Sequence, residues 1–247
     1  MALQPHLMVR AEDVGQCVLI PGDPKRVSLM SEHLEDAKKV GENRQFVSYT
    51  GHYSGVKTSI VSSGIGVPAM LITCEELYRC GCKVFVRVGT TGGLRKGVDV
   101  GDLVVANAAV RTDGGTQAYA PMDYPAVADR ALTTLLVQEC EKAGVKVAEG
   151  IVWTSDAYYA ENLDKAKHWS ALGAVSVEME CSGLFVFSTI KSVKAGAILV
   201  ADGNLIYGSK RSEQSMDKAY ADQVIESLHK ATEIALRAAT ERLRGLG

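Results

Sequence analysis

An arginine interrupts an apolar stretch in the first half of the chain and is followed at once by glycines and threonines. Residues 83–93 read KVFVRVGTTGG, which places Arg87 at the end of a predicted buried strand. A buried guanidinium is costly unless an anion pairs with it. Glycine and threonine offer backbone N–H groups and hydroxyls with little bulk, and such groups bind phosphate. The segment predicts either a phosphate pocket or an arginine paired with Asp or Glu in a tight turn.

A second anion-binding candidate lies at residues 22–26, which read GDPKR where a short strand gives way to a helix. Asp23 is a suitable N-cap, and Pro24 suits the first helical position. Helix N-termini attract anions, and basic side chains in a first turn oppose the helix dipole unless a ligand is present. Taken alone, the segment is more typical of a surface turn with solvated Lys25 and Arg26.

Two carboxylates flank one methionine where a third strand gives way to a helix. Glu178 and Glu180 point the same way if this segment is extended, because side chains alternate along a strand. Two carboxylates could accept hydrogen bonds from a vicinal diol such as the ribose 2′,3′-hydroxyls. They could also form a glycosidase-like acid/base pair, or be the acidic first turn of a helix.

One further carboxylate ends the most apolar run of the chain. Asp202 follows residues 195–201, which read AGAILVA. A carboxylate at the end of a buried strand is partly removed from water and is suited to act as a general acid. The alternative is a turn, because Asp-Gly-Asn at 202–204 is also favourable turn chemistry.

These residues must be positioned by alternating strands and helices. We expect strands at 17–21, 46–51, 56–63, 83–88, 103–110, 145–153, 175–179 and 195–201, and helices at 25–34, 68–81, 126–143, 162–172, 180–189 and 213–243. Such alternation is typical of an α/β fold with a mainly parallel sheet covered on both faces. Ligands of these sheets bind outside the carboxyl ends of the strands, which is where the candidate residues fall.

The composition argues against several classes of function. The chain has 247 residues and a formal net charge of −2, so it has no basic field for nucleic acid or an anionic membrane. It shows no secretory signal and no apolar run long enough to cross a bilayer. Its six cysteines fall mostly in apolar patterns, which favours free thiols in the cytoplasm.

Three other kinds of site find little support. Cys80 and Cys82 lack a second Cys or His pair at zinc spacing, so we predict no metal. Gly64 and Gly66 follow a strand as in a dinucleotide site, but Pro68 interrupts the pattern and no acidic residue follows the next strand. No G-x-S-x-G elbow indicates a hydrolase.

Taken in order along the chain, the four segments resemble the hexameric purine nucleoside phosphorylase and uridine phosphorylase family. The resemblance rests on residues 22–24, 87–92 and 178–180 and on Asp202, and it covers nearly the whole chain. It implies one domain over residues 1–247, built as a three-layer α/β/α sandwich around a mixed, mainly parallel sheet. It also implies cleavage of nucleosides by inorganic phosphate, which is a co-substrate, with no further cofactor.

The resemblance assigns a role to each matching residue. It places phosphate at Gly22, Arg26, Arg44, Arg87 and Thr90; ribose at His6, Met179 and Glu180, with Glu178 beside them; and the base at Tyr158, Val177 and Asp202. Asp202 is then the catalytic acid at the purine N7. His6 and Arg44 are expected to reach the site of a neighbouring subunit, which implies a homo-oligomer of dimers, a hexamer in this family.

The choice of base rests on two positions. Uridine-specific members carry a Gln and an Arg soon after the aromatic residue, whereas residues 160–164 read AENLD and place Asp164 there. This difference and Asp202 favour a purine nucleoside. Uridine phosphorylase and methylthioadenosine phosphorylase or nucleosidase remain the alternatives, together with a nucleoside-binding protein that lacks activity. Lys210 and Arg211 are both available to assist Asp202, and the sequence does not choose between them.

Overall fold

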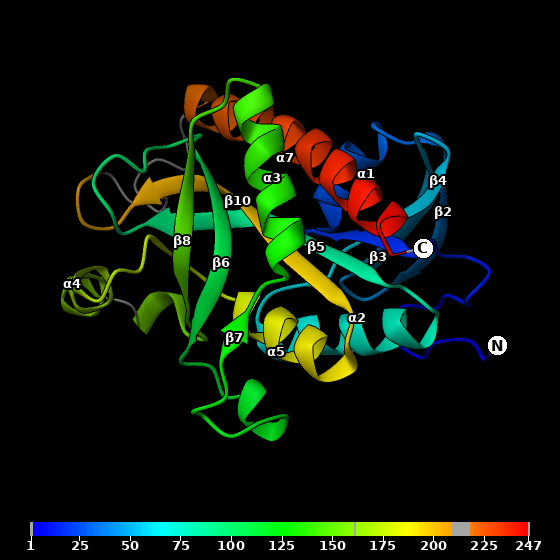
Figure 1. The fold of residues 1–247 in the computed structure, drawn as a ribbon, viewed down its shortest axis with the longest axis horizontal. Helices are drawn as coiled ribbons and strands as arrows, with labels where there is room; N and C mark the ends of the chain where they lie inside the picture. Colours follow the sequence, from blue (N-terminus) through cyan, green and yellow to red (C-terminus); the bar gives the residue numbers. More distant parts are fainter. Residues whose placement is uncertain (1, 161, 209–217, 247) are drawn as a thin grey trace.

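The computed structural model describes residues 2–160, 162–208 and 218–246, and ten strands within them form one sheet (Figure 1). The strands are β1 (Cys17–Ile20), β2 (Glu35–Asn43), β3 (Phe46–Tyr53), β4 (Val56–Val61), β5 (Val84–Gly93), β6 (Leu103–Arg111), β7 (Ala126–Val127), β8 (Val147–Thr154), β9 (Ser176–Glu178) and β10 (Lys194–Asn204). The described helices are α1 (Pro24–Ser31), α2 (Val67–Arg79), α3 (Arg130–Lys142), α4 (Leu163–Ala171), α5 (Cys181–Lys191) and α7 (Lys218–Arg244), with 3-10 turns η1 (Thr116–Ala118) and η2 (Tyr158–Ala160).

The sheet is mixed and partly closed. Its order is β10-β6-β8-β9-β5-β1-β4-β3-β2, and β10 also pairs with β5, so five of the strands form a ring. Parallel pairs join β1 to β4 and β5, β5 to β10, and β8 to β6 and β9. Antiparallel pairs join β2, β3 and β4 in sequence, β6 to β10 and β7, and β5 to β9. The predicted mixed sheet is confirmed, with parallel pairing at its centre.

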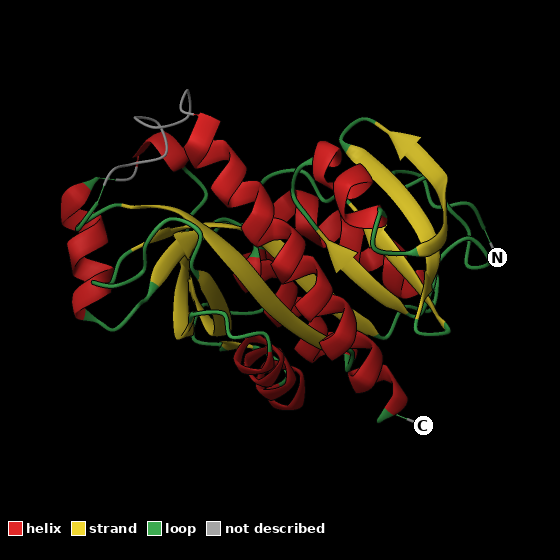
Figure 2. Ribbon diagram, turned by 90° about the horizontal axis from the view of Figure 1, so that it is seen from above, coloured by secondary structure: helices red, strands yellow, loops and turns green. Residues whose placement is uncertain are grey.

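Helices cover both faces of this sheet, as the three-layer prediction requires. α1, α3 and α7 lie on one face and α2 and α5 on the other (Figure 1), and the long α7 lies over β5, β10 and β1 (Figure 2). The alternation along β5 separates the two cores: Val84, Val86 and Val88 pack beneath α7, whereas Phe85 packs toward α2 and α5. Arg87 stands two residues beyond Phe85 and therefore points to the same face.

The ends of β5 and β10 were predicted too short. We expected residues 89–93 to form a loop, but β5 continues to Gly93, and β10 continues past Ala201 to Asn204. The reason is mutual pairing, since Thr91 lies opposite Ala201 and Gly92 lies opposite Val177 of β9. Arg87 therefore lies in the middle of a strand and not at its end.

Two other elements differ from expectation. β2 was not predicted, because its polar sequence EDAKKVGEN lacks an alternating apolar face, and it forms the exposed edge of the sheet. The helix expected from residue 126 begins at Arg130, where the Asp129 side chain accepts a hydrogen bond from the Leu132 N–H, and β7 occupies the preceding residues. The start of the predicted C-terminal helix, at 213–217, lies outside the described residues.

The described helices include none that is long and apolar enough to cross a membrane. All six cysteines are buried free thiols. Within residues 2–160, 162–208 and 218–246, no group of three or more His, Cys, Asp or Glu side chains is arranged to hold a metal ion.

Candidate active site

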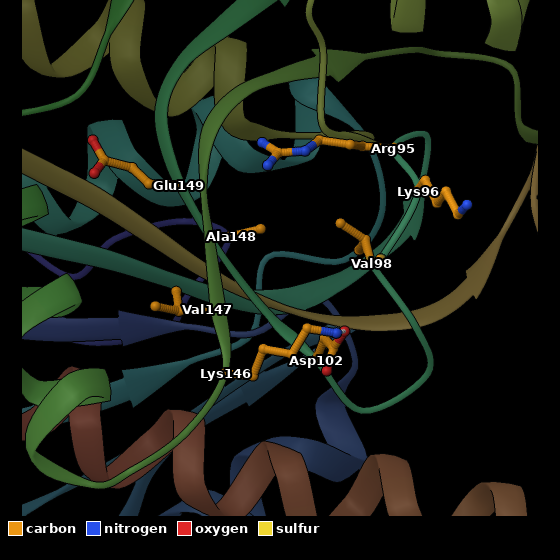
Figure 3. Close-up of a pocket in the computed structure, with 9 residues that line it drawn as sticks. Arg95, Lys96, Val98, Asp102, Lys146, Val147, Ala148 and Glu149 are labelled. Atoms are coloured by element: carbon orange, nitrogen blue, oxygen red, sulfur yellow. Dashed lines mark hydrogen bonds and ion pairs between the residues drawn. The ribbon is translucent and has the colours of Figure 1, made fainter.

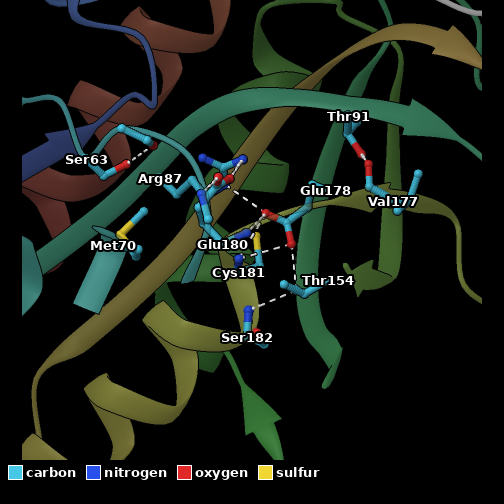
Figure 4. A network of polar contacts seen from close by, with 12 residues as sticks. Ser63, Met70, Arg87, Thr91, Thr154, Val177, Glu178, Glu180, Cys181 and Ser182 are labelled. Atoms are coloured by element: carbon cyan, nitrogen blue, oxygen red, sulfur yellow. Dashed lines mark hydrogen bonds and ion pairs between the residues drawn. The ribbon is translucent and has the colours of Figure 1, made fainter. Parts of the chain in front are cut away.

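A buried arginine of β5 contacts two glutamates (Figure 4). Arg87 Nε donates to Glu178 Oε2 at 3.0 Å, and Arg87 Nη2 forms an ion pair with Glu180 Oε2. The Arg87 side chain is 4% exposed and the Glu178 side chain is fully buried. Although β9 ends at Glu178 and the segment is not extended as far as Glu180, both carboxylates reach the same arginine.

Burial and charge act in opposite directions on these groups. Burial would lower the pKa of Arg87, but Glu180 and Glu178 outweigh it and hold the Arg87 pKa above its ordinary value, so the guanidinium stays charged. Burial, together with the charge of Glu178, raises the pKa of Glu180 against the opposing effect of Arg87. Glu180 is therefore easier to protonate than an exposed glutamate.

The position of the guanidinium depends on Gly89. A Cβ atom at this residue would lie 2.7 Å from Arg87 Cζ and 2.8 Å from Nη2, so any larger residue would push the guanidinium away. The glycine-rich run after Arg87 thus has a direct steric role, because it lets a long side chain lie flat against its own strand.

Glu180 is held by the start of another helix. Its Oε1 accepts a hydrogen bond of 2.6 Å from the N–H of Gly66, the N-cap residue of α2, where φ is 90°. The neighbouring Gly64 N–H donates to the carbonyl oxygen of Gly22 at 3.0 Å, so the loop before α2 lies beside the predicted phosphate residue Gly22. Gly64 and Gly66 therefore do not belong to a dinucleotide motif: Gly66 binds Glu180, and Gly64 binds Gly22.

The helix signal at residues 23–26 is confirmed. The Asp23 side chain accepts from the Lys25 N–H at 2.9 Å, and Pro24 begins α1. Arg26 is half-buried in this first turn. It lines a pocket of about 370 Å³ with Asp23, Lys25, Leu29, Asp202, Tyr220, Ala221, Val224, Ile225 and Leu228. The structure thus brings two predicted residues, Arg26 and Asp202, to one pocket between α1 and α7.

Asp202 lies within the end of β10 and is 7% exposed. Its carbonyl oxygen accepts a 2.6 Å hydrogen bond from the Tyr220 hydroxyl of α7. The turn considered for 202–204 is formed instead by Asn204, whose Oδ1 accepts from the N–H groups of Ile206 and Tyr207 at 3.0 and 2.9 Å. Lys210 and Arg211 lie outside the described residues.

Three of the predicted base and ribose residues lie in β9, directly after it, and in η2. Val177 is buried, and its carbonyl oxygen accepts from Thr91 Oγ1 at 2.7 Å, whereas Thr90 is half-buried opposite Val200. Met179 is half-buried between the two glutamates. Tyr158 in η2 is 42% exposed and follows Ser155, whose N–H donates to the Glu178 carbonyl oxygen.

His6 and Arg44 lie together at an edge of the molecule. His6 Nδ1 lies 2.6 Å from Glu76 Oε1, and the Asn43 side chain donates to the His6 carbonyl oxygen at 3.0 Å. Arg44 is exposed in the turn between β2 and β3 with φ at 54°. The hydrogen bond from Asn43 ties the His6 segment to the turn that carries Arg44, so the two residues lie near each other at the surface.

A second pocket of about 270 Å³ lies apart from these residues. It is formed by the loop after β5 and the start of β8, and Arg95, Lys96, Asp102, Lys146 and Glu149 are among its lining residues (Figure 3). None of the predicted site residues lines it. Asn204 Nδ2 ties its loop to β10 by donating to the carbonyl oxygens of Arg95 and Val98 at 2.9 Å.

Comparison with known proteins gives a consistent picture. A family model described as "Phosphorylase superfamily" matches residues 16–241. The chain is 35% identical over 240 residues to a guanosine phosphorylase of Halorubrum lacusprofundi, covering 97% of this chain and 99% of the relative. It is 37% identical over 210 residues to a uridine phosphorylase of Treponema pallidum, covering 81% of each. A solved structure of uridine phosphorylase from Vibrio fischeri ES114 superposes with a TM-score of 0.89 at 30% identity, covering 98% of both chains.

A substitution at Gly89 tests the steric role of this residue. We expect Gly89→Ala to displace the Arg87 guanidinium from both glutamates and to lower the free energy of unfolding by about 1–3 kcal/mol, since a buried ion pair loses contacts. Thermal unfolding and a crystal structure of the variant provide the measurement. Gly245→Ala is the control, because a Cβ there meets its nearest neighbour at an ordinary 3.6 Å. An unshifted guanidinium at unchanged stability would contradict the argument.

Proposed function

The chain belongs to the phosphorylase superfamily and is a nucleoside phosphorylase, and we propose that it acts on purine nucleosides. It would use inorganic phosphate to release the free base and ribose or deoxyribose 1-phosphate. We place it in the cytoplasm, where free thiols such as its six buried cysteines persist.

The observation that carries the purine assignment is the placement of Asp202. Its position at the end of β10, in a pocket shared with Arg26, suits a group that gives a proton to a leaving purine. The match to a guanosine phosphorylase along 97% of this chain supports the same assignment. The matches to uridine phosphorylases favour a second candidate, uridine, although Asp164 stands where an arginine is expected in that branch.

Phosphate is proposed to bind at Arg87, with Arg26, Gly22, Thr90 and Arg44. Two of the three Arg87 nitrogens already contact Glu178 and Glu180, which leaves Nη1 to donate to an anion. Three arginines around one anion argue for a phosphate nucleophile, since water requires none. The bound phosphate beneath C1′ would supply both the attacking oxygen and negative charge that stabilises the oxocarbenium-like transition state.

Ribose is proposed to bind at Glu180, with Met179 beneath it and Glu178 beside it. Glu180 Oε1 accepts from the Gly66 N–H, and Oε2 pairs with Arg87. A carboxylate has about four acceptor sites, so Glu180 keeps capacity for the two ribose hydroxyls. The base would then lie against Tyr158 and Val177 and near Asp202, which shares a proton with its N7 as the glycosidic bond breaks.

The proposed assembly is a homo-oligomer of dimers, with six subunits in all. His6 and Arg44 are exposed or half-buried at one edge, and Glu76 and Asn43 hold the segment that carries His6. In a two-fold dimer this edge would deliver His6 to the ribose 5′-hydroxyl and Arg44 to the phosphate of the neighbouring site.

The first test is the release of base from inosine and, separately, from uridine, with and without phosphate. We expect phosphate-dependent release of hypoxanthine with little uracil. Asp202→Asn should lower the rate about 10²- to 10⁴-fold, because it removes the proton donor, whereas Asp222→Asn on the exposed part of α7 should have no effect. Phosphate-dependent uracil release would overturn the purine assignment, and release without phosphate would indicate a nucleosidase.

The raised pKa of Glu180 predicts a pH dependence for nucleoside binding. Only the ionised carboxylate accepts both hydroxyls, and a raised pKa means that protonation begins at a higher pH than for an ordinary glutamate. Calorimetry without phosphate should therefore show affinity falling as the pH drops, at values still above about 4.3. Glu180→Gln should bind weakly at every pH, and Asp202→Asn should keep the pH dependence. A flat wild-type profile would refute the assignment.

Sharing of residues between subunits can be tested with two inactive variants. His6→Ala and Asp202→Ala subunits that are assembled together should recover activity, because some mixed sites contain neither substitution. The control is a mixture of the two variants assembled separately. If both preparations are equally inactive, His6 acts within its own subunit or not at all.

A further inference from the structure

The carboxylate of Glu178 is saturated with hydrogen bonds from the protein (Figure 4). Its Oε2 accepts from Arg87 Nε at 3.0 Å and from the Glu180 N–H at 2.8 Å. Its Oε1 accepts from Thr154 Oγ1 at 2.6 Å, and the Cys181 N–H lies 3.0 and 2.9 Å from the two oxygens. Four donors fill the acceptor sites of one carboxylate. Glu178 is thus arranged to hold Arg87 more than to meet a ligand.

One of these donors has its direction fixed by a second contact. Thr154 ends β8 directly opposite Glu178 of β9, and its side chain is fully buried. While its hydroxyl donates to Glu178, it accepts from the Ser182 N–H in the first turn of α5 at 3.0 Å. The Thr154 hydroxyl therefore fixes the carboxylate of Glu178 relative to the start of α5.

The same helix turn is anchored from its other side. Ser182 Oγ donates to Asp113 Oδ2 at 2.7 Å, and Asp113 is fully buried. The Asp113 carboxylate also accepts from the Thr116 N–H at 2.6 Å and from the Thr116 hydroxyl at 2.9 Å. A continuous chain of hydrogen bonds thus runs from the segment after β6 through Ser182, Thr154 and Glu178 to Arg87.

We propose that Thr154 is a positioning residue for phosphate, and that Ser182 and Asp113 support it: through Glu178 they set the direction in which Arg87 presents its remaining donor. The inference rests on the proposed binding of phosphate at Arg87. Loss of the Thr154 hydroxyl leaves Glu178 Oε1 short of a donor in a buried site, so the carboxylate must rotate and the guanidinium must follow it. The donor that Arg87 offers to phosphate then points in a different direction, and phosphate binds more weakly.

The test compares Thr154→Val, which removes the hydroxyl at nearly constant volume, with Thr154→Ser, which keeps it. We expect Thr154→Val to raise the KM for phosphate about 10-fold or more, with a several-fold smaller change in the KM for nucleoside. Thr154→Ser should stay close to the wild-type values. Equal changes in both KM values, or a fall in thermal stability alone, would overturn the proposal and leave Thr154 a structural residue.

Two further variants distinguish a failure of the positioning role from a failure of the proposed phosphate site. Ser182→Ala leaves Thr154 in place and removes only the hydrogen bond between Ser182 and Asp113. This variant should raise the phosphate KM about 3-fold. It provides the test if Thr154→Val does not fold. Arg87→Met reports on the proposed phosphate site itself. A raised phosphate KM in Arg87→Met but not in Thr154→Val or Ser182→Ala refutes the positioning role alone, whereas an unchanged phosphate KM in Arg87→Met refutes both proposals.

Discussion

The main constraint on this structure is the energetic cost of burying one arginine and two carboxylates together. Each charge would be strongly unfavourable in the interior by itself, and Arg87 can neutralise only one of the two glutamates. The remaining charge is met by two helix N-termini, since Glu178 accepts from the first N–H of α5 and Glu180 accepts from the N-cap N–H of α2. The two helices on this face of the sheet therefore complete the charge balance of the centre in addition to covering the core.

As a result of this charge balance, the two glutamates have different roles. The Glu178 side chain has no exposed surface and all its acceptor sites are filled by protein donors, so Glu178 serves to orient Arg87. Glu180 is bound by the Gly66 N–H and the Arg87 guanidinium and keeps acceptor capacity, so it is the carboxylate suited to a diol. The two glutamates of one motif thus differ in chemistry, because Glu178 ends β9 whereas Glu180 occupies the N-cap position of α5.

Much of this arrangement was predictable from local sequence. Alternation placed Glu178 and Glu180 on one side, and the Asp23-Pro24 signal predicted the start of α1. The extension of β5 could not be predicted in the same way. Residues 89–93 have the composition of a loop, and they form a strand because Thr91 pairs with Ala201, more than a hundred residues away. Thr154 was missed for a related reason, since a threonine after an apolar strand reveals nothing until its long-range partner is known. The roles proposed for His6 and Arg44 depend on a second subunit and remain predictions.

The position of β10 in the sheet has a consequence for the order in which the chain can fold. This strand comes late in the sequence, yet it lies between β5 and β6 and closes the ring of five strands. During synthesis, β5 and β6 emerge roughly a hundred residues before the strand that joins them, so both must wait with unpaired edges. Arg87 itself acquires its carboxylate partners only when the chain has reached α5. A nascent chain that stops short of β9 therefore holds an unneutralised arginine beside an open sheet edge, which is the kind of intermediate that chaperones recognise.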